Sequence, residues 1–167
     1  MSGKDSVANI LKNKMELKNK KVLITHFADL LKYICRTFFN WDGVKDEAGR
    51  QILQYVGTDI IRRTKPDYWC DFLINFLSMF KNEWDYVLIP DCRFQNEMRW
   101  PEEWDTTAVR VERLNFISPL SSTQQNHISE TALDYYRFDY TIASESGLDK
   151  LEIEVNKFIK WMEDING

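Results

Sequence analysis

Short apolar segments alternate with amphipathic ones along most of the chain, and this alternation limits the possible folds more than any other feature. Apolar runs typical of buried strands occur near residues 21–26, 85–90, 107–112 and 139–143. Apolar residues spaced three and four apart predict helices near residues 5–18, 27–38, 52–60, 66–80 and 148–162. Strands that alternate with helices favour a mainly parallel sheet with helices on both faces. We therefore expect an α/β fold, in one domain spanning residues 1–167.

Several details of this expectation can be tested residue by residue. The third helix is expected to bury Ile52, Leu53, Val56 and Ile60. Pro66 is expected in the first turn of the fourth helix, a position that proline favours. That helix should carry one apolar face made of Trp69, Phe72, Leu73, Phe76, Leu77 and Phe80. A short helix is expected after Arg93. The polar stretch 113–128 is the best candidate for a mobile, lid-like loop.

Composition excludes several classes of protein. The net charge of −4 argues against a general nucleic-acid binder, which normally needs a basic face. The three cysteines, Cys35, Cys70 and Cys92, form no CxxC pair, so free thiols in a reducing compartment are expected. No apolar run approaches the roughly 18 residues that a membrane span needs, and the polar start around Lys4 does not resemble a signal peptide. A cytoplasmic protein that acts on small molecules, with no membrane or nucleic-acid partner, is the expectation.

The first candidate site lies at the start of the chain. Gly3 and Lys4 immediately precede a predicted helix, as in the second half of a phosphate-binding loop, G-x-x-x-x-G-K-[ST]. Glycine lets the backbone approach a phosphate, the first N–H groups of the helix point at the anion, and the lysine reaches the outer phosphates. Asp5 stands where serine or threonine usually binds magnesium, with Ser6 one place later. The alternative is a frayed helix start with a solvated lysine.

A second candidate site follows the strand near residues 85–90. Asp91 ends this apolar run and Arg93 comes two residues later. Ligand sites in open α/β sheets lie at the carboxyl ends of strands. There, a carboxylate can organise magnesium or accept a proton, and an arginine can hold a phosphate with two hydrogen bonds. The alternative is an ordinary Pro-Asp turn.

A third cluster lies in the middle of the chain. Arg50 and Gln54 are four residues apart, on one face of a predicted helix. Gly57 and Thr58 permit a close backbone approach, and Arg62 and Arg63 add positive charge. The alternative is a solvated, charged helix face.

Taken together, these segments resemble the deoxynucleoside monophosphate kinase family of phages and bacteria. Five segments are similar to family motifs and occur in the same order. They are Ser2–Ala8 (S-G-K-D-[ST]-[IV]-A), Phe27–Lys32 (F-A-D-x-L-K), Arg50–Asp59 (R-x-x-L-Q-x-x-G-T-[DE]), Ile89–Glu97 (I-x-D-[VC]-R-F-x-N-E) and His127–Asp134 (H-x-S-E-x-x-L-D).

The resemblance implies a three-layer P-loop NTPase fold, with ATP and Mg²⁺ as cosubstrates and a deoxynucleoside monophosphate as acceptor. It implies that Ser2, Gly3, Lys4, Asp5 and Ser6 bind ATP, that Lys4, Asp91 and Arg93 are catalytic, and that Asp5, Ser6 and Asp91 lie near magnesium. Acceptor binding would fall to Arg50, Gln54, Thr58, Arg62, Arg63, Trp69 and Glu130. A ring of arginine and lysine is what phosphoryl transfer requires.

The chain departs from the family pattern at one place. Family members have a strand and G-x-x-x ahead of the position of Ser2, and in this fold that strand is central. We therefore expect the central first strand to be absent, with a gap or loose packing between the strands near 21–26 and 85–90. Two alternatives stay open: a phosphomevalonate-kinase-like enzyme, which shares S-G-K-D and S-E-x-x-L-D, and a non-catalytic nucleotide-binding remnant, which the missing half of the phosphate-binding loop favours. The sequence is also compatible with a homodimer.

Overall fold

The computed structural model describes residues 3–115, 131–145 and 147–166, and the chain divides into two compact units. The first, here called the sheet unit, comprises Met1–Ile24 and Trp84–Gly167. The second, here called the helical unit, is Thr25–Glu83. In the sequence it is inserted between two strands of the sheet unit. Each unit is described by itself.

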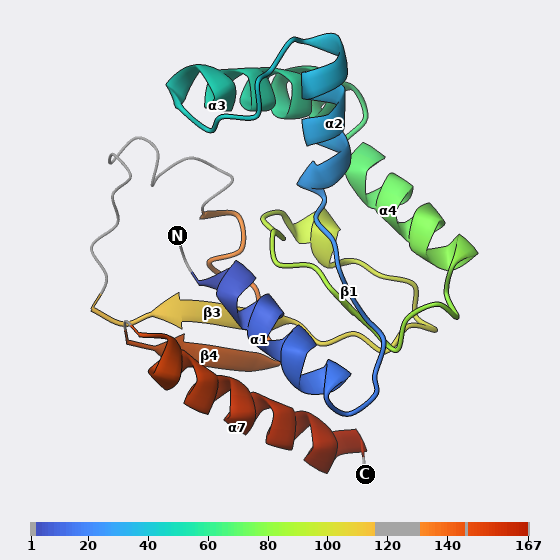
Figure 1. Ribbon diagram of the computed structural model, residues 1–167. Helices are drawn as coiled ribbons and strands as arrows, with labels where there is room; N and C mark the ends of the chain where they lie inside the picture. Colours follow the sequence, from blue (N-terminus) through green and yellow to red (C-terminus); the bar gives the residue numbers. More distant parts are fainter. Residues whose placement is uncertain (1–2, 116–130, 146, 167) are drawn as a thin grey trace. The chain divides into compact units, whose positions relative to one another are not determined.

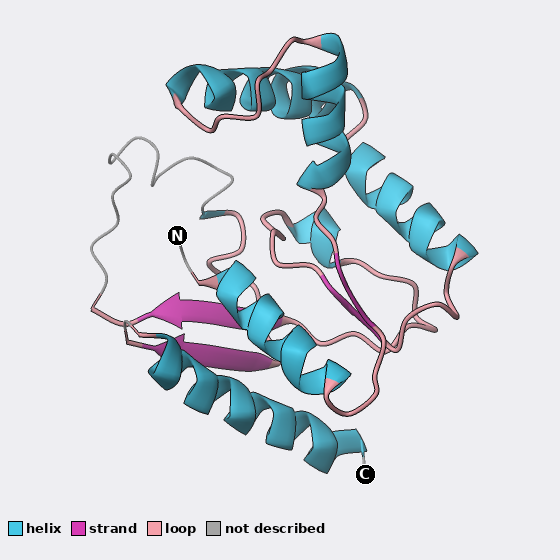
Figure 2. Ribbon diagram, viewed as in Figure 1, coloured by secondary structure: helices cyan, strands magenta, loops and turns pink. Residues whose placement is uncertain are grey.

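The sheet unit combines short parallel strands with two long helices (Figures 1 and 2). Its elements are α1 (Lys4–Glu16), β1 (Val22–Ile24), β2 (Tyr86–Leu88), the 3₁₀-helix η2 (Gln95–Met98), β3 (Val109–Arg113), β4 (Tyr140–Ser144) and α7 (Leu148–Asn166). All four strands expected from the sequence are present, as are the first and last helices and the short helix after Arg93. The expected loop 113–128 begins slightly later, because Arg113 is the last residue of β3; residues 116–128 lie outside the described parts of the chain.

The strands pair in two separate parallel ladders. β1 pairs with β2, with Val22 opposite Tyr86 and Ile24 opposite Leu88, and β3 pairs with β4. The expectation of parallel strands is thus confirmed for both pairs. The expected gap between the strands near 21–26 and 85–90 is wrong, because these two strands bond to each other directly along their backbones. Among the described strands, the break in pairing falls between the β1–β2 ladder and the β3–β4 ladder.

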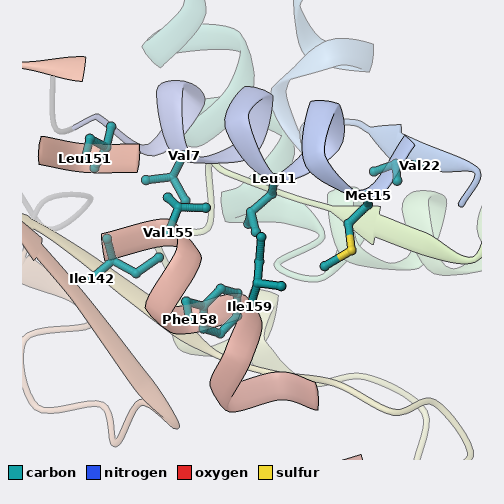
Figure 3. Packing of buried hydrophobic residues seen from close by; sticks show 9 residues of the cluster. All are labelled: Val7, Leu11, Met15, Val22, Ile142, Leu151, Val155, Phe158 and Ile159. Atoms are coloured by element: carbon teal, nitrogen blue, oxygen red, sulfur yellow. The ribbon is translucent and has the colours of Figure 1, made fainter. Parts of the chain in front are cut away.

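The core of the sheet unit forms where α1 meets α7 and the strands (Figure 3). Val7, Leu11 and Met15 recur every four residues and so share one face of α1. They pack with Val155 of α7 and Ile142 of β4, both of which are fully buried. The amphipathic spacing in the sequence therefore predicts the buried faces of both helices.

The helical unit contains α2 (Ala28–Phe38), α3 (Glu47–Gln54), the π-helix η1 (Tyr55–Arg62) and α4 (Tyr68–Met79). Two expectations need correction here. Pro66 lies in a turn ahead of α4, closed by the Tyr68 N–H bonding to the Lys65 carbonyl, and so does not open the helix. The apolar face expected on α4 is also narrower than the sequence suggests, because Trp69, Leu73 and Leu77 are buried while the phenylalanines at 72, 76 and 80 are exposed.

The third predicted helix is really two helices in series. α3 is an α-helix, but from Tyr55 the chain continues with the wider i→i+5 hydrogen bonding of a π-helix. Val56 is buried as expected, whereas Ile60 is 40% exposed and the neighbouring Ile61 packs against the core instead. The expectation for Ile60 is wrong because it assumed the α-helical period throughout.

Gly49, in the first turns of α3, predicts a stability effect. Its N–H donates to the Asp46 carboxylate (2.7 Å), and the Trp41 indole donates to the Val44 carbonyl (2.9 Å), so the preceding turn lies tightly over this glycine. A β-carbon at Gly49 would lie 2.0 Å from the Val44 carbonyl oxygen, a backbone atom that cannot move aside easily.

Gly49→Ala is therefore expected to lower the free energy of unfolding by about 1–3 kcal/mol, the usual cost of overpacking. The measurement is urea unfolding, followed by circular dichroism. The matched control is Ala48→Ser at the exposed neighbouring position, expected to change the free energy by less than about 0.5 kcal/mol. Equal stability of the two variants would show that the turn over Gly49 is loose.

Candidate active site

The start of α1 has the backbone geometry of an anion-binding site. Gly3 is the residue before the helix, and its φ of 85° lies in the left-handed region that favours glycine. The first helical hydrogen bond runs from the Val7 N–H to the Gly3 carbonyl (2.9 Å). The N–H groups ahead of Val7 therefore point out of the helix start, where a phosphate can accept from them.

Lys4 is the first residue of this helix, and several charged side chains influence its pKa. Burial lowers the pKa of Lys4 below its ordinary value, and the positive charge of Arg93 lowers it further. Cys92, Asp91 and Asp5 act in the opposite direction. Because charges shift one another's pKa only over a limited distance, Gly3–Lys4 and Asp91–Arg93 lie in the same neighbourhood of the sheet unit. That the first two candidate sites form one functional site stays a prediction.

The segment that carries Asp91 and Arg93 is held by a buried carboxylate. Glu97, on η2, is only 3% exposed. Its Oε2 atom accepts hydrogen bonds from the backbone N–H of Arg93 (2.6 Å) and of Phe94 (3.0 Å). Glu97 therefore fixes the backbone of Arg93 in the loop between β2 and η2. No role was predicted for Glu97 from the sequence; the available signal was a glutamate three residues after the residue that precedes a short helix.

The metal assignment of Asp5, Ser6 and Asp91 stays a prediction. Within the described residues, no group of three or more histidine, cysteine, aspartate or glutamate side chains forms a cage for a metal ion. Asp5 and Asp91 nevertheless both act on the charge of Lys4, so two carboxylates lie in the neighbourhood of the helix start. This donor set suits magnesium, which usually binds through one or two carboxylates together with substrate phosphates and water.

The helical unit carries the third candidate cluster. Arg50 and Gln54 lie on α3, Thr58 and Arg62 on η1, and Arg63 directly follows η1. They belong to a different compact unit from Lys4 and Arg93, so their convergence on one cleft stays a prediction. Two further assigned residues, Ser2 and Glu130, lie outside the described parts of the chain, as does His127.

Trp69 has a structural contact within the helical unit. It is buried, and its indole N–H donates to the Gly57 carbonyl oxygen (3.3 Å). Trp69 therefore ties α4 to the π-helix. Its predicted role in binding the acceptor remains a prediction.

The helical unit also contains a charged network around Asp29 that was not predicted from the sequence. Asp29 accepts from the His26 backbone N–H (2.9 Å), lies 3.2 Å from the His26 ring and pairs with Lys32 (2.9 Å). Burial acts to raise the pKa of Asp29, but the hydrogen bond and charge of Lys32, with His26, outweigh it and hold the pKa below 3.8. The i, i+3 spacing of aspartate and lysine was the available signal.

The three cysteines are thiols that form no disulfide. Cys35 and Cys70 are buried and Cys92 is half-buried, and burial raises the pKa of the Cys35 thiol. In the described parts of the chain, no helix is both long and apolar enough to cross a bilayer.

Comparison with known proteins identifies the class to which this fold and site belong. Residues 40–155 match the family described as deoxynucleotide monophosphate kinase. This match includes Arg50–Arg63 and the Asp91–Glu97 segment, while Gly3 and Lys4 lie ahead of it. The chain belongs to the deoxynucleotide monophosphate kinase family.

Two named relatives carry the same description. The deoxynucleotide monophosphate kinase of Enterobacteria phage T4 is 27% identical over 113 residues, which cover 66% of this chain and 45% of the relative. The enzyme of the same name from Escherichia phage RB69 is 26% identical over 113 residues, covering 66% and 44%. The matched region thus spans less than half the length of each relative.

Proposed function

We propose that this protein transfers the γ-phosphoryl group of ATP to a deoxynucleoside monophosphate and releases ADP and the deoxynucleoside diphosphate. The observation that carries the proposal is the position of Lys4, at a left-handed glycine and helix start, near Asp91 and Arg93 in the loop that follows β2. Membership of the deoxynucleotide monophosphate kinase family supports the same reaction. The two units would then form one nucleoside-monophosphate-kinase-like domain with the three-layer P-loop architecture.

In this reaction, an oxygen of the acceptor phosphate attacks the γ-phosphorus, and the bond from that phosphorus to the β-phosphate oxygen breaks. Lys4 and the first N–H groups of α1 would hold the ATP phosphates. Arg93 would neutralise charge on the transferring group, and Glu97 holds its backbone in place. Mg²⁺, held by Asp91 with Asp5 or Ser6, would supply further charge neutralisation. The acceptor would bind to residues of the helical unit.

An acceptor panel tests the proposal. The full chain is incubated with ATP, Mg²⁺ and each of dAMP, dCMP, dGMP, dTMP and phosphomevalonate, and ADP formation is measured. We expect turnover with at least one deoxynucleotide and none with phosphomevalonate. Turnover with phosphomevalonate alone would favour the alternative enzyme. Nucleotide binding without turnover on any acceptor would favour a non-catalytic nucleotide-binding protein.

Two arginine substitutions test how the acceptor and the transferring phosphoryl group are held. A phosphate monoester carries close to two negative charges, since its second pKa is about 6, so bringing it beside ATP requires fixed cations. Lysine keeps the charge of arginine but loses its planar, two-point hydrogen bonding. Arg50→Lys and Arg93→Lys are therefore expected to lower kcat/KM for the deoxynucleotide by about tenfold or more, and Arg50→Lys should leave the KM for ATP nearly unchanged. Wild-type efficiency in both variants would place the acceptor site elsewhere.

A further inference from the structure

The break in pairing between the two ladders of the sheet unit lies beside the start of α1. A β-carbon at Gly3 would lie 3.9 Å from the Cγ1 atom of Val111, so the chain enters α1 next to β3. The loop that follows β2 reaches the same neighbourhood, because Asp91 and Arg93 both influence the pKa of Lys4. The end of β2 and the middle of β3 therefore both approach the first turn of α1, although the two strands belong to different ladders.

Helix α1 packs on both ladders and joins them into one core. The buried cluster around α1 contains Val22 of β1 and Ile142 of β4, which lie at opposite ends of the group drawn in Figure 3. Leu88 of β2 and Val111 of β3 pack against the same cluster. The two ladders thus share their apolar contacts, whereas no described pairing joins their backbones.

The two strands beside the break are less buried than their composition predicts. Val87 and Leu88 belong to an apolar run typical of a parallel strand that is covered on both faces, yet no residue of β2 is buried. The same holds for β3, where Val109 and Val111 are only half-buried. In contrast, Ile142 of β4 is 0% exposed. Apolar area therefore remains open along β2 and β3.

The backbones of these strands can accept a further neighbour. Each of the four described strands pairs with one other strand. A strand directs its N–H and C=O groups to both of its edges, so β2 and β3 each have a second edge that their ladders do not use. Donors and acceptors that repeat about every 3.3 Å along two facing edges are matched by one kind of ligand, an extended polypeptide.

We infer that the break between β2 and β3 binds an extended apolar peptide from a separate chain, which adds as a strand and joins the two ladders into one sheet. A peptide of about five residues matches the length of β3 (Val109–Arg113). Its side chains would alternate between the two faces and cover the open apolar area beside Leu88 and Val111. Charged residues or proline inside the peptide would not fit, because charges would lie against the core and proline lacks the N–H that the edge requires. The inference does not depend on the proposed function.

The test is amide hydrogen exchange, followed by NMR on the ¹⁵N-labelled full chain with and without a synthetic peptide. The peptide has five alternating valine and isoleucine residues, matching the length of β3, and a lysine at each end for solubility. Binding protects an amide by the factor 1 + [peptide]/Kd. At about ten times Kd, the amides of Tyr86–Leu88 and Val109–Glu112 that face the break should therefore exchange about tenfold more slowly. Amides on the outer edges of β1 and β4 should change by less than about threefold.

The matched control is the same peptide with methyl groups on alternate backbone nitrogens. It keeps every apolar side chain but loses the donors along one edge, so it should bind at least about tenfold more weakly. No binding of the unmodified peptide, equal binding of the two peptides, or protection confined to the outer edges of β1 or β4 would overturn the inference. Slow exchange of the same β2 and β3 amides in the chain alone would also overturn it, because the break would then already be filled.

Discussion

Lys4→Ala is expected to lower kcat by about 10² or more, the usual effect of removing a preorganised charge at a transferring phosphoryl group. The structure supports this size of effect because Lys4 stands at the start of α1, behind a left-handed glycine and within the charge cluster of Asp91 and Arg93. The measurement is steady-state kinetics with the accepted deoxynucleotide. An active Lys4→Ala enzyme would remove the phosphate-loop assignment of Gly3 and Lys4.

The lowered pKa of Lys4 also predicts how replacing this lysine affects stability. This prediction separates a loss of turnover from a loss of folding. Because burial, together with Arg93, lowers this pKa in the folded chain, the unfolded chain binds the proton more readily, and the charge costs stability below the folded-state pKa. Raising the pH through that pKa relieves the cost. Lys4→Met, which keeps an apolar side chain of similar length, should therefore melt at the same or a higher temperature at neutral pH while losing turnover. A lower melting temperature would mean that the lysine is needed for folding.

The same pKa predicts the alkaline side of the pH profile. Lys4 must be protonated to hold the phosphates, and it loses its proton at a lower pH than the ordinary value of 10.5. We expect kcat/KM for ATP to fall as the pH rises through this lowered pKa. A profile that stays flat up to pH 10.5 would contradict the lowered pKa of Lys4.

Glu97→Ala is expected to have the second large effect. It would remove the acceptor of the part-buried backbone N–H groups of Arg93 and Phe94, which costs up to about 1–3 kcal/mol for each group. It would also release the backbone that positions Arg93, and a displacement of about 1 Å in a catalytic group can cost about 10² in rate. We therefore expect a loss of both stability and turnover.

Glu97→Gln is the matched comparison, because its amide oxygen can still accept from both N–H groups. It should retain most of the stability and lose less than about tenfold in kcat. Both variants are assayed well below their melting temperatures, so that unfolding does not contribute to the rates. If Glu97→Ala keeps full turnover, the buried carboxylate supports the fold without positioning the arginine.

The strands and helices could be predicted because their signals are local. Val7, Leu11 and Met15 recur at the α-helical period and are buried in α1. The short apolar run at residues 86–88 lies between polar turns, which is enough to mark a strand. Parallel pairing followed from the alternation of strands with helices, and both ladders confirm it.

Features that depend on tertiary contacts could not be predicted in the same way. The exchange of Ile60 for Ile61 in the core follows from the π-helical winding, which depends on the approach of Leu31 to Gly57 and the Trp69 hydrogen bond. Neither contact is visible in the spacing of apolar residues. The pairing of β1 with β2 likewise depends on how distant segments meet.

The same distinction between local signals and tertiary contacts applies to the candidate site. Lys4, Asp91 and Arg93 could be singled out because glycine-lysine at a helix start and aspartate at a strand end have chemical meaning by themselves. The sequence alone did not show that these residues lie near one another. In the structure, Asp91 and Arg93 both influence the pKa of Lys4. The role of Glu97 was not predicted, since its importance lies in a buried side chain bonding to the backbone.

The most direct test of the central claim follows the phosphoryl group itself. The full chain is incubated with Mg²⁺, ATP labelled in its γ-phosphoryl group, and the accepted deoxynucleoside monophosphate, and the products are separated. Phosphoryl transfer predicts that the label enters the deoxynucleoside diphosphate in a one-to-one ratio with the ADP formed, and that Lys4→Ala abolishes most of this label. Release of the label as inorganic phosphate, with no labelled deoxynucleoside diphosphate, would contradict the account.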